Sequence, residues 1–156
     1  MTSDGAARGL SEACMIETAE GPVSMRETPK KGFAVMTRMD DGAVGFRQLM
    51  RLEERADVPL VRIRLDNGHA VVVARDHRFF RAGMEPVRAA DLAPGDALET
   101  AFRYPEGYLP TGMDGVPAAW GVKVTGVEDA GVGTVMFGTV NDTHRLFLTA
   151  GVLCAE

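Results

Sequence analysis

The alternation of apolar and polar residues over 60–73 predicts a β-hairpin. Apolar side chains stand at every second position of 61–65, with arginines between them, so this segment has one buried and one exposed face as a strand. Asn67-Gly68 follows, a pair that readily adopts the positive φ angles of a two-residue hairpin turn. The apolar run over 70–73 then predicts a returning strand that is buried on both faces.

Short apolar segments separated by Gly, Pro, Asn and Asp continue along most of the chain. Residues 44–55 are predicted to form a long twisted strand, because their flanks favour a strand although Phe46, Leu49 and Met50 have helical spacing. We also predict one helical turn over 86–92, a long loop over 104–118, and strands over 122–127, 134–140 and 145–153, with Gly131 and Gly133 connecting the first two of these strands. This pattern favours an all-β, barrel-like or sandwich architecture.

Composition and charge restrict the functions that the chain can have. It has 156 residues, of which 46% are hydrophobic, and this suits one domain with its own core. The net charge of −5 argues against nucleic acids and anionic membranes as partners. We find no apolar stretch long enough to cross a bilayer and no secretion signal. Two cysteines cannot form a dense disulfide framework, so we expect a reducing compartment, the cytoplasm. We also expect the protein to be a monomer.

Two side chains that are far apart in the sequence favour covalent chemistry. Cys14 begins an apolar segment, and His77 follows the strand predicted over 70–73. A thiolate is a strong nucleophile, and an imidazole titrates near neutrality, so it can hold and deliver a proton. We therefore predict that Cys14 and His77 lie close together as a nucleophile and its general acid.

Four blocks of residues support this interpretation by their order. They are Cys14 with Thr18, Gly21 and Val23; the glycine hairpin from Gly68 to His77; residues 87–96, of the form V-x-A-x-D-L-x-x-G-D; and residues 140–153, with His144 and Phe147. This order resembles the Hint module shared by inteins, bacterial intein-like domains and the hedgehog autoprocessing domain. The resemblance covers Cys14 to Glu156 and implies an all-β horseshoe of many short antiparallel strands, in which the N- and C-terminal ends converge.

The resemblance also implies a self-processing reaction. Residues 1–13 would be a flanking leader and residues 14–156 the Hint domain. In the family the Cys sulfur attacks the preceding carbonyl, here that of Ala13, and a thioester replaces the Ala13–Cys14 peptide bond, while His77 would protonate the departing nitrogen. The acyl acceptor would be water, an external thiol or an amine, so the partners would be these nucleophiles and the chain's own flanks. No cofactor is implied, and the chain would act once rather than turn over.

Several positions depart from the family pattern. Ala74 stands where a Thr usually helps to hold the scissile peptide, and Gly138 lies near a position where many inteins have an acid. Ala155-Glu156 stand where an intein has His-Asn, and that Asn attacks its own carbonyl in the second half of splicing. We therefore expect N-terminal cleavage from this chain, but not full splicing.

Three more residues are candidates for supporting roles. Asp142 and His144 are two positions apart, so they share one face of an extended segment, and the fold would bring them beside the first strand. Asp76 precedes His77 directly, but adjacent residues of a strand point to opposite faces. A direct relay between Asp76 and His77 is therefore not expected.

Cys154 adds a second thiol on the last predicted strand. Because the two ends of the module would converge, we hypothesise that Cys154 and Cys14 form a disulfide that keeps the nucleophile inactive until it is reduced. Cys14, His77, His144 and Cys154 are also residue types that bind zinc tetrahedrally. Their spacing gives this arrangement no support, so no metal site is predicted.

Two other functions stay open at the level of sequence. The first is a Hint fold that has lost its chemistry and serves as a binding or linking module, which the departures at Ala74, Gly138 and Ala155-Glu156 favour. The second is an unrelated β-barrel that binds a small ligand. A structure in which Cys14 and His77 are not close together would favour this second alternative.

Overall fold

The computed structural model describes residues 7–28, 33–101 and 122–156. In chain order the elements are β1 (Leu10–Ser11), β2 (Met15–Thr18), β3 (Gly21–Ser24), the 3₁₀ turn η1 (Met25–Glu27), β4 (Phe33–Arg38), β5 (Val44–Leu65), β6 (Ala70–Ala74), β7 (Arg78–Arg81), β8 (Glu85–Arg88), the 3₁₀ turn η2 (Ala89–Asp91), β9 (Ala97–Leu98), β10 (Val122–Val140), β11 (Arg145–Phe147) and β12 (Leu153–Ala155). The strands join antiparallel into one sheet, which confirms the all-β class. Within these ranges no helix is long and apolar enough to cross a membrane.

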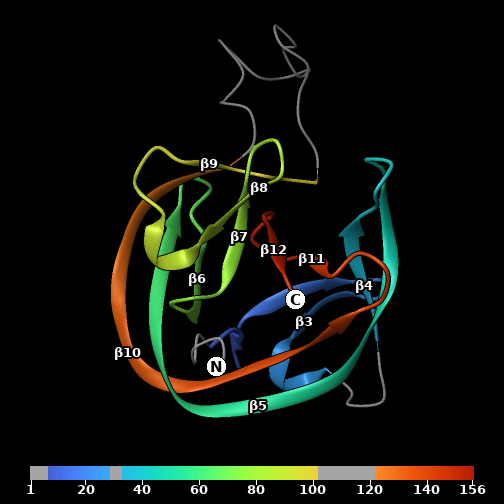
Figure 1. Ribbon diagram of the computed structural model, residues 1–156, viewed down its shortest axis with the longest axis horizontal. Coiled ribbons are helices and arrows are strands. Elements are labelled where there is room, and N and C mark those ends of the chain that lie inside the picture. Colours follow the sequence, from blue (N-terminus) through green and yellow to red (C-terminus); the bar gives the residue numbers. More distant parts are fainter. Residues whose placement is uncertain (1–6, 29–32, 102–121) are drawn as a thin grey trace, which may run out of the picture.

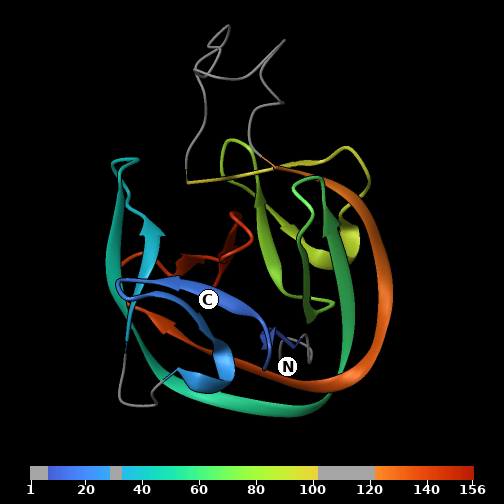
Figure 2. The same cartoon turned by 180° about the vertical axis from the view of Figure 1, so that it is seen from behind.

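Strands β5 and β10 form the frame of the molecule. They pair along most of their lengths, from Val124 opposite Leu65 to Val140 opposite Leu49, and they curve together around the fold (Figure 1). The shorter strands β6, β7 and β12 lie within this curve in both views (Figure 1, Figure 2). The fold is therefore the predicted horseshoe of antiparallel strands.

The predicted hairpin forms where the alternating pattern placed it. Val61 of β5 lies opposite Val73 of β6, and Gly68 in the turn has a φ angle of +87°. The side-chain oxygen of Asn67 accepts a hydrogen bond from the His69 N–H over 3.0 Å, which closes the turn. The segment 44–55 is the first half of β5, as predicted, because pairing with β4 and β10 on its two edges satisfies the backbone as a strand.

Strand β10 continues through the segment that was predicted to connect two strands. We predicted strands over 122–127 and 134–140, but 122–140 is a single strand. Gly131 has a φ angle of +79°, and the register with β5 shifts between Asp129 and Val132. A glycine at positive φ in a β-bulge lets a strand bend without leaving the sheet. The glycines therefore mark a bulge rather than a turn.

Two predictions for shorter segments are also corrected, and a third concerns residues outside the described ranges. Residues 145–153 contain a turn at Gly151, with a φ angle of +97°, so β11 and β12 pair with each other instead of forming one strand. The helical turn predicted over 86–92 is limited to η2, because residues 85–88 pair with β7 as β8. The loop predicted over 104–118 lies outside the described residues.

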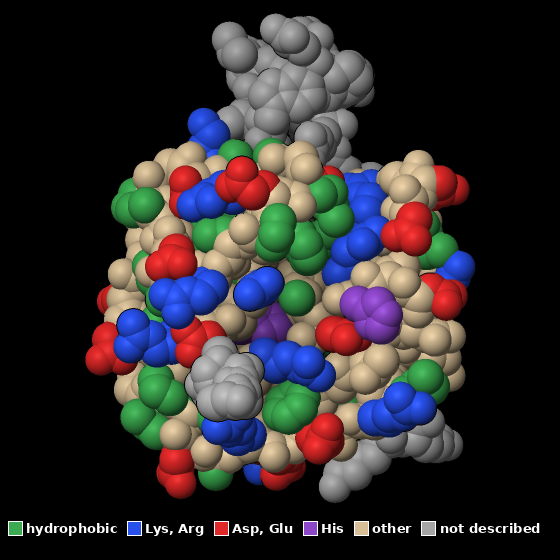
Figure 3. Space-filling model, viewed as in Figure 1, with side chains coloured by type: hydrophobic (Ala, Val, Ile, Leu, Met, Phe, Trp, Pro, Cys, Tyr) green, Lys and Arg blue, Asp and Glu red, His purple; other side chains and the backbone are tan. Residues whose placement is uncertain are grey.

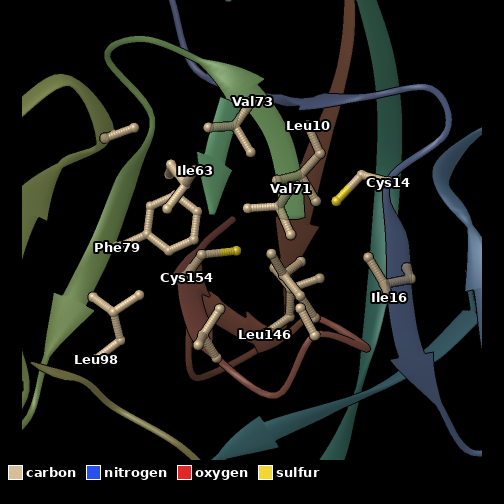
Figure 4. Close-up of a cluster of buried hydrophobic side chains, with 14 of the residues drawn as sticks. Leu10, Cys14, Ile16, Ile63, Val71, Val73, Phe79, Leu98, Leu146 and Cys154 are labelled. Carbon is tan, nitrogen blue, oxygen red and sulfur yellow. The ribbon is translucent and has the colours of Figure 1, made fainter. Parts of the chain in front are cut away.

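The core is formed by buried side chains from strands that are far apart in the sequence. Ile16, Ile63 and Phe79 are each 0% exposed, and they belong to one cluster of apolar side chains (Figure 4). Burial of one side chain of this size contributes about 1.5–3 kcal/mol to folding. The cluster therefore holds β2, β5 and β7 together.

Both cysteines belong to this core, and both thiols are free. Cys14 precedes β2 directly and Cys154 lies on β12, and Figure 4 shows their sulfur atoms entering the cluster from different segments. The structure therefore does not contain the hypothesised disulfide. The two side chains fill the core as small apolar groups, which is the common role of a buried free cysteine.

Candidate functional site

His77 lies at the point where β6 turns into β7. Its backbone N–H donates to the Ala74 carbonyl over 2.9 Å, and its own carbonyl accepts from the Ala89 N–H over 2.7 Å. These bonds fix the turn and hold the side chain in the interior, where His77 is 1% exposed. The imidazole also contacts Phe79 edge to face, with the ring centroids 5.8 Å apart. Backbone hydrogen bonds and packing therefore set the position of His77.

The Nδ1 atom of His77 accepts a hydrogen bond from the backbone N–H of Gly9 over 3.0 Å. This N–H belongs to the Arg8–Gly9 peptide bond. The Gly9 carbonyl accepts from the Ala74 N–H, also over 3.0 Å, so both polar backbone groups of Gly9 are held by the segment that carries His77. The peptide bond in contact with His77 is thus the one before Gly9, five positions (14 − 9) before Cys14.

Gly9 has a backbone conformation that favours glycine strongly. Its φ angle is +138°, which residues with a side chain rarely adopt. A Cβ atom at this position would lie 2.8 Å from both Cβ and Cγ2 of Val135, which is closer than van der Waals contact. The absence of a side chain is what allows this segment to pass so close to β10.

The segment around Gly9 is part of the sheet. Strand β1 lies between two partners, with Leu10 opposite Val73 of β6 and opposite Met136 of β10. Ala7 is buried in a second, smaller apolar cluster. Residues 1–13 were expected to be a flanking leader, but from Ala7 onward this segment packs into the fold.

A cavity of about 340 Å³ opens beside His77. It is lined by the two ends of the described chain and by the β6–β7 turn, with the residues Ala7, Arg8, Asp76, His77, Arg78, His144, Ala155 and Glu156. Charged and histidine side chains gather around a recess on this face of the molecule (Figure 3). Five residues that the sequence singled out therefore lie around one cavity, namely Asp76, His77, His144, Ala155 and Glu156.

Burial sets the protonation state of His77. Loss of hydration lowers its pKa from 6.5 to about 4; the Ala155 carbonyl opposes this shift and the Arg8 charge adds to it. The ring is therefore neutral at pH 7. Because Nδ1 accepts the Gly9 N–H, the ring proton is on Nε2. Nε2 is buried without an acceptor at full hydrogen-bond geometry among the described residues, and the Ala155 carbonyl is the backbone acceptor that interacts with the ring.

His144 and Glu156 meet at the rim of the cavity. The Nδ1 atom of His144 lies 3.0 Å from Oε1 of Glu156, and Oε2 accepts the Val140 N–H over 2.6 Å. The backbone supports this pair, because the Glu156 N–H donates to the His144 carbonyl over 3.1 Å. Both oxygens of the Glu156 carboxylate are therefore already bound within the chain.

Cys14 lies in a different environment from His77. Its N–H donates to the Ser11 carbonyl over 3.0 Å, and its carbonyl accepts from the Met25 N–H over 2.9 Å. Burial raises the pKa of its thiol from 9.0 to about 12. Together with Ala13 it lines a separate cavity of about 230 Å³. The predicted pairing is corrected accordingly, since neither ring nitrogen of His77 bonds to the thiol.

The other candidate residues have structural partners. Asp142 is exposed at a φ angle of +65°, binds Arg47 over 3.1 Å and does not line the cavity. Asp76 lines the cavity, but its carboxylate is bound by Arg88 over 2.6 Å. Ala74 is fully buried and contributes its backbone N–H. None of these three side chains contacts the His77 ring through a hydrogen bond in the described part of the chain.

This geometry offers no nucleophile at the peptide bond that His77 contacts. An acyl shift at Arg8–Gly9 requires a thiol or hydroxyl on residue 9, and glycine has no side chain. At Ala13–Cys14 a thiol is present, but the nitrogen that would depart bonds to a backbone carbonyl instead of an imidazole. With a pKa near 12, only about one Cys14 in 10⁵ is a thiolate at pH 7. The arrangement is suited to holding a peptide strand.

Sequence reasoning missed Ala7, Arg8, Gly9 and Arg78. The search for a nucleophile selected the first thiol of the chain, whereas glycine offers no side chain that would mark its position. One usable signal was Leu10, a large apolar residue among small and polar neighbours. Leu10 is 3% exposed, so it indicated that this part of the expected leader enters the core.

Solved structures of intein-type domains match this chain along nearly its whole length. The bacterial intein-like domain from Clostridium thermocellum is 19% identical, with a TM-score of 0.76, and the match covers 96% of this chain and 99% of that chain. The DnaB intein from Synechocystis sp. is 16% identical, with a TM-score of 0.72, over 96% and 99% of the two chains. The DnaX mini intein from Spirulina platensis is 14% identical, with a TM-score of 0.71, over 95% and 98%.

The match is one of structure rather than of sequence. No protein-family model matches the sequence, and no curated protein sequence matches it. At these identities the likeness concerns the arrangement of the strands, which agrees with the horseshoe built on β5 and β10. This chain therefore has the Hint fold of inteins and bacterial intein-like domains.

Proposed function

We propose that this chain is a Hint-fold module that holds its flanking peptide without cleaving it, and that the cavity beside His77 is a binding site. The observation that carries the proposal is the hydrogen bond from the Gly9 N–H to His77 Nδ1. In the family this histidine assists the departure of an amide nitrogen. Here the nitrogen that it contacts belongs to a residue without a side chain, so the contact is kept while the nucleophile is missing.

The pairing of β1 supports a linking role. Neighbouring strands flank both of its edges, β6 on one side and β10 on the other, so the upstream flank enters through the sheet. Strand β12 leads to Glu156 at the same cavity. Any segments attached before residue 7 and after residue 156 would therefore be held close together by the module.

The hydrogen bonds of Glu156 support the absence of a splicing reaction at the C-terminal end of the described chain. In splicing, the residue at this place attacks its own carbonyl with a free side-chain nitrogen. At Glu156 one carboxylate oxygen accepts the Val140 N–H and the other contacts His144. Ala155 supplies no imidazole to assist. A carboxylate bound in this way is held as a structural group.

Cleavage of the Ala13–Cys14 bond by Cys14 is the second candidate function. The observation in its favour is that Ala13 is exposed, and that it lines a cavity together with Cys14, so an external thiol or water can reach this bond. The reaction would form a thioester between the Ala13 carbonyl and the Cys14 sulfur and then release residues 1–13. It requires the thiol to leave the core and to lose a proton from a group whose pKa is about 12.

Intact-mass spectrometry of the full chain separates these functions. We expect one intact species after incubation with dithiothreitol and, separately, with hydroxylamine, which cleaves thioesters. The Cys14→Ala variant serves as the control and should behave identically. Release of residues 1–13 from the wild type but not from this variant would contradict the proposal and establish cleavage by Cys14. Release of residues 1–8 would contradict it in another way, by showing that the Arg8–Gly9 bond is reactive.

A second variant tests whether the contact between His77 and the Gly9 N–H can assist cleavage of the Arg8–Gly9 peptide bond. The double substitution Gly9→Cys, Val135→Ala adds a thiol at the contacted peptide bond and removes the Val135 atoms that a Cβ would meet at 2.8 Å. We expect dithiothreitol to release residues 1–8 from this variant, because Nδ1 of the neutral His77 ring can take up the proton that the attacking thiol loses and deliver it to the departing nitrogen. If the folded variant stays intact, the contact between His77 and Gly9 is not the remnant of a catalytic arrangement.

A further inference from the structure

The turn between β5 and β6 contains the pair Asn67-Gly68, and both residues are exposed. No atom lies within 4 Å of the position that a Cβ on Gly68 would take, so its nitrogen is free of side-chain hindrance. In such a pair this nitrogen can attack the preceding side-chain amide and form a cyclic imide. The other asparagine of the chain, Asn141, precedes Asp142, whose nitrogen is hindered by a side chain.

The side-chain amide of Asn67 also joins two turns that are far apart in the sequence. Its Nδ2 donates to the carbonyl oxygen of Ala150 over 2.7 Å, and its Oδ1 accepts the His69 N–H over 3.0 Å. Ala150 is buried and precedes Gly151 in the turn between β11 and β12. One amide group therefore fixes this turn, from which β12 leads to the cavity beside His77.

We propose that Asn67 is a modification site, where deamidation removes the side-chain amide and releases the β11–β12 turn from the β5–β6 turn. The Gly68 nitrogen forms a bond to Cγ of Asn67, the Cγ–Nδ2 bond breaks, and the Gly68 proton leaves with Nδ2 as ammonia. Water then opens the imide at one of its two carbonyls, which gives aspartate or isoaspartate. No oxidant or cofactor is required, and the inference does not depend on the proposed function.

Both products oppose the contact with Ala150. A carboxylate only accepts hydrogen bonds, so it would place an acceptor against the Ala150 carbonyl, where Nδ2 now donates over 2.7 Å. The new charge would also stand beside Asp66, whose Oδ1 accepts the Lys123 N–H over 3.1 Å. Isoaspartate in addition lengthens the backbone of a tight turn by one carbon atom. The modified turn is therefore expected to separate from β11 and β12.

The turn must open before the attack can occur. The Gly68 N–H donates to the Leu65 carbonyl over 3.2 Å, and both ends of the Asn67 amide are bound. These are neutral hydrogen bonds, whose net contribution is small, and an exposed turn opens more readily than the core. We therefore expect slow deamidation of the folded chain instead of complete protection.

Ageing of the full chain at mildly alkaline pH, followed by peptide mass spectrometry, tests the inference. We expect the deamidated product to accumulate at least about fivefold faster at Asn67 than at Asn141, because only Asn67 precedes a glycine. Hydroxylamine displaces the Gly68 nitrogen from the imide, so it should split the aged chain after Asn67 and leave the fresh chain intact. These fragments differ from residues 1–8 and 1–13, whose release would contradict the proposed function.

The variant Asn67→Asp tests the release of the turn. The Gly151 N–H donates to the Leu148 carbonyl over 2.8 Å, and we expect its hydrogen exchange to be about fivefold faster in this variant, the effect of losing one neutral hydrogen bond. Asn141→Asp adds the same charge at the other exposed asparagine and should leave this rate unchanged. Absence of deamidation at Asn67, or equal rates at both asparagines, would overturn the site. Unchanged exchange at Gly151, or equal exchange in both variants, would overturn the release.

Discussion

At the scale of the residue, the site depends on a position without a side chain. Gly9 presents its N–H to His77 and its carbonyl to the Ala74 N–H, and it lies against Val135 of β10. A larger residue would have to change the backbone angle, the position of β10, or both. The absence of a side chain at Gly9 therefore allows β1 to approach β10.

We predict that Gly9→Ala lowers the free energy of unfolding by about 2–3 kcal/mol, because it combines a strained φ angle with overpacking. The φ angle is +138° and the new Cβ would meet Val135 at 2.8 Å. Urea unfolding followed by circular dichroism measures the loss. Gly21→Ala is the matched control, with a φ angle of +98° and no atom within 4 Å of the Cβ position, and should lose about 1 kcal/mol. Equal losses would show that contact with Val135 is unimportant.

At the scale of the element, the sequence predicts structures that form within one segment, and it misses features that depend on pairing with a distant segment. The hairpin over 60–73 follows from period-two alternation and Asn67-Gly68, both of which are contained within the segment. The continuity of β10 depends on β5, which pairs with it through the bulge at Gly131. The partner of His77 is a backbone N–H, and backbone groups leave no mark in a residue pattern. Side-chain chemistry alone therefore favoured Cys14.

The close approach of β10 to β5 gives a prediction for one glycine. A Cβ on Gly138 would lie 2.8 Å from the Met50 carbonyl oxygen, which belongs to the backbone of β5. We expect Gly138→Ala to lower the free energy of unfolding by about 1–3 kcal/mol, because the two strands must separate locally. Gly126→Ala on the same strand is the control, since no atom lies within 4 Å of its Cβ position, and should change stability by about 0.5 kcal/mol or less. If urea unfolding gives equal losses for both, the strands can move apart without penalty.

At the scale of the whole molecule, the fold brings the two ends of the described chain to one cavity. Ala7 and Arg8 line it from one end, and Ala155 and Glu156 from the other. Family resemblance gave this convergence from the sequence, together with His77 and His144, and it predicted Cys14 as the nucleophile, whereas the backbone group that His77 contacts is the Gly9 N–H. Our proposal of binding in place of cleavage follows from this contact and from the packing of the Cys14 thiol in the core.

The buried neutral ring of His77 makes the stability of the whole molecule depend on pH. Its pKa is about 4 in the folded chain and 6.5 as an ordinary histidine, so between these values the unfolded chain binds more protons than the folded chain. Stability from this group is therefore complete above pH 6.5 and is lost as the pH falls toward 4, by roughly 3 kcal/mol in total. We expect the stability difference between wild type and His77→Gln, measured by urea unfolding at several pH values, to shrink as the pH falls from 6.5 to 4.

Two comparisons isolate the contribution of His77. The difference between the two proteins removes the pH dependence of the carboxylates that both share. The variant His69→Gln, in the exposed β5–β6 turn, controls for the loss of one imidazole. Parallel stability curves for wild type and His77→Gln would mean that His77 has the same pKa in the folded and unfolded chains, so that burial would not keep the ring neutral below pH 6.5.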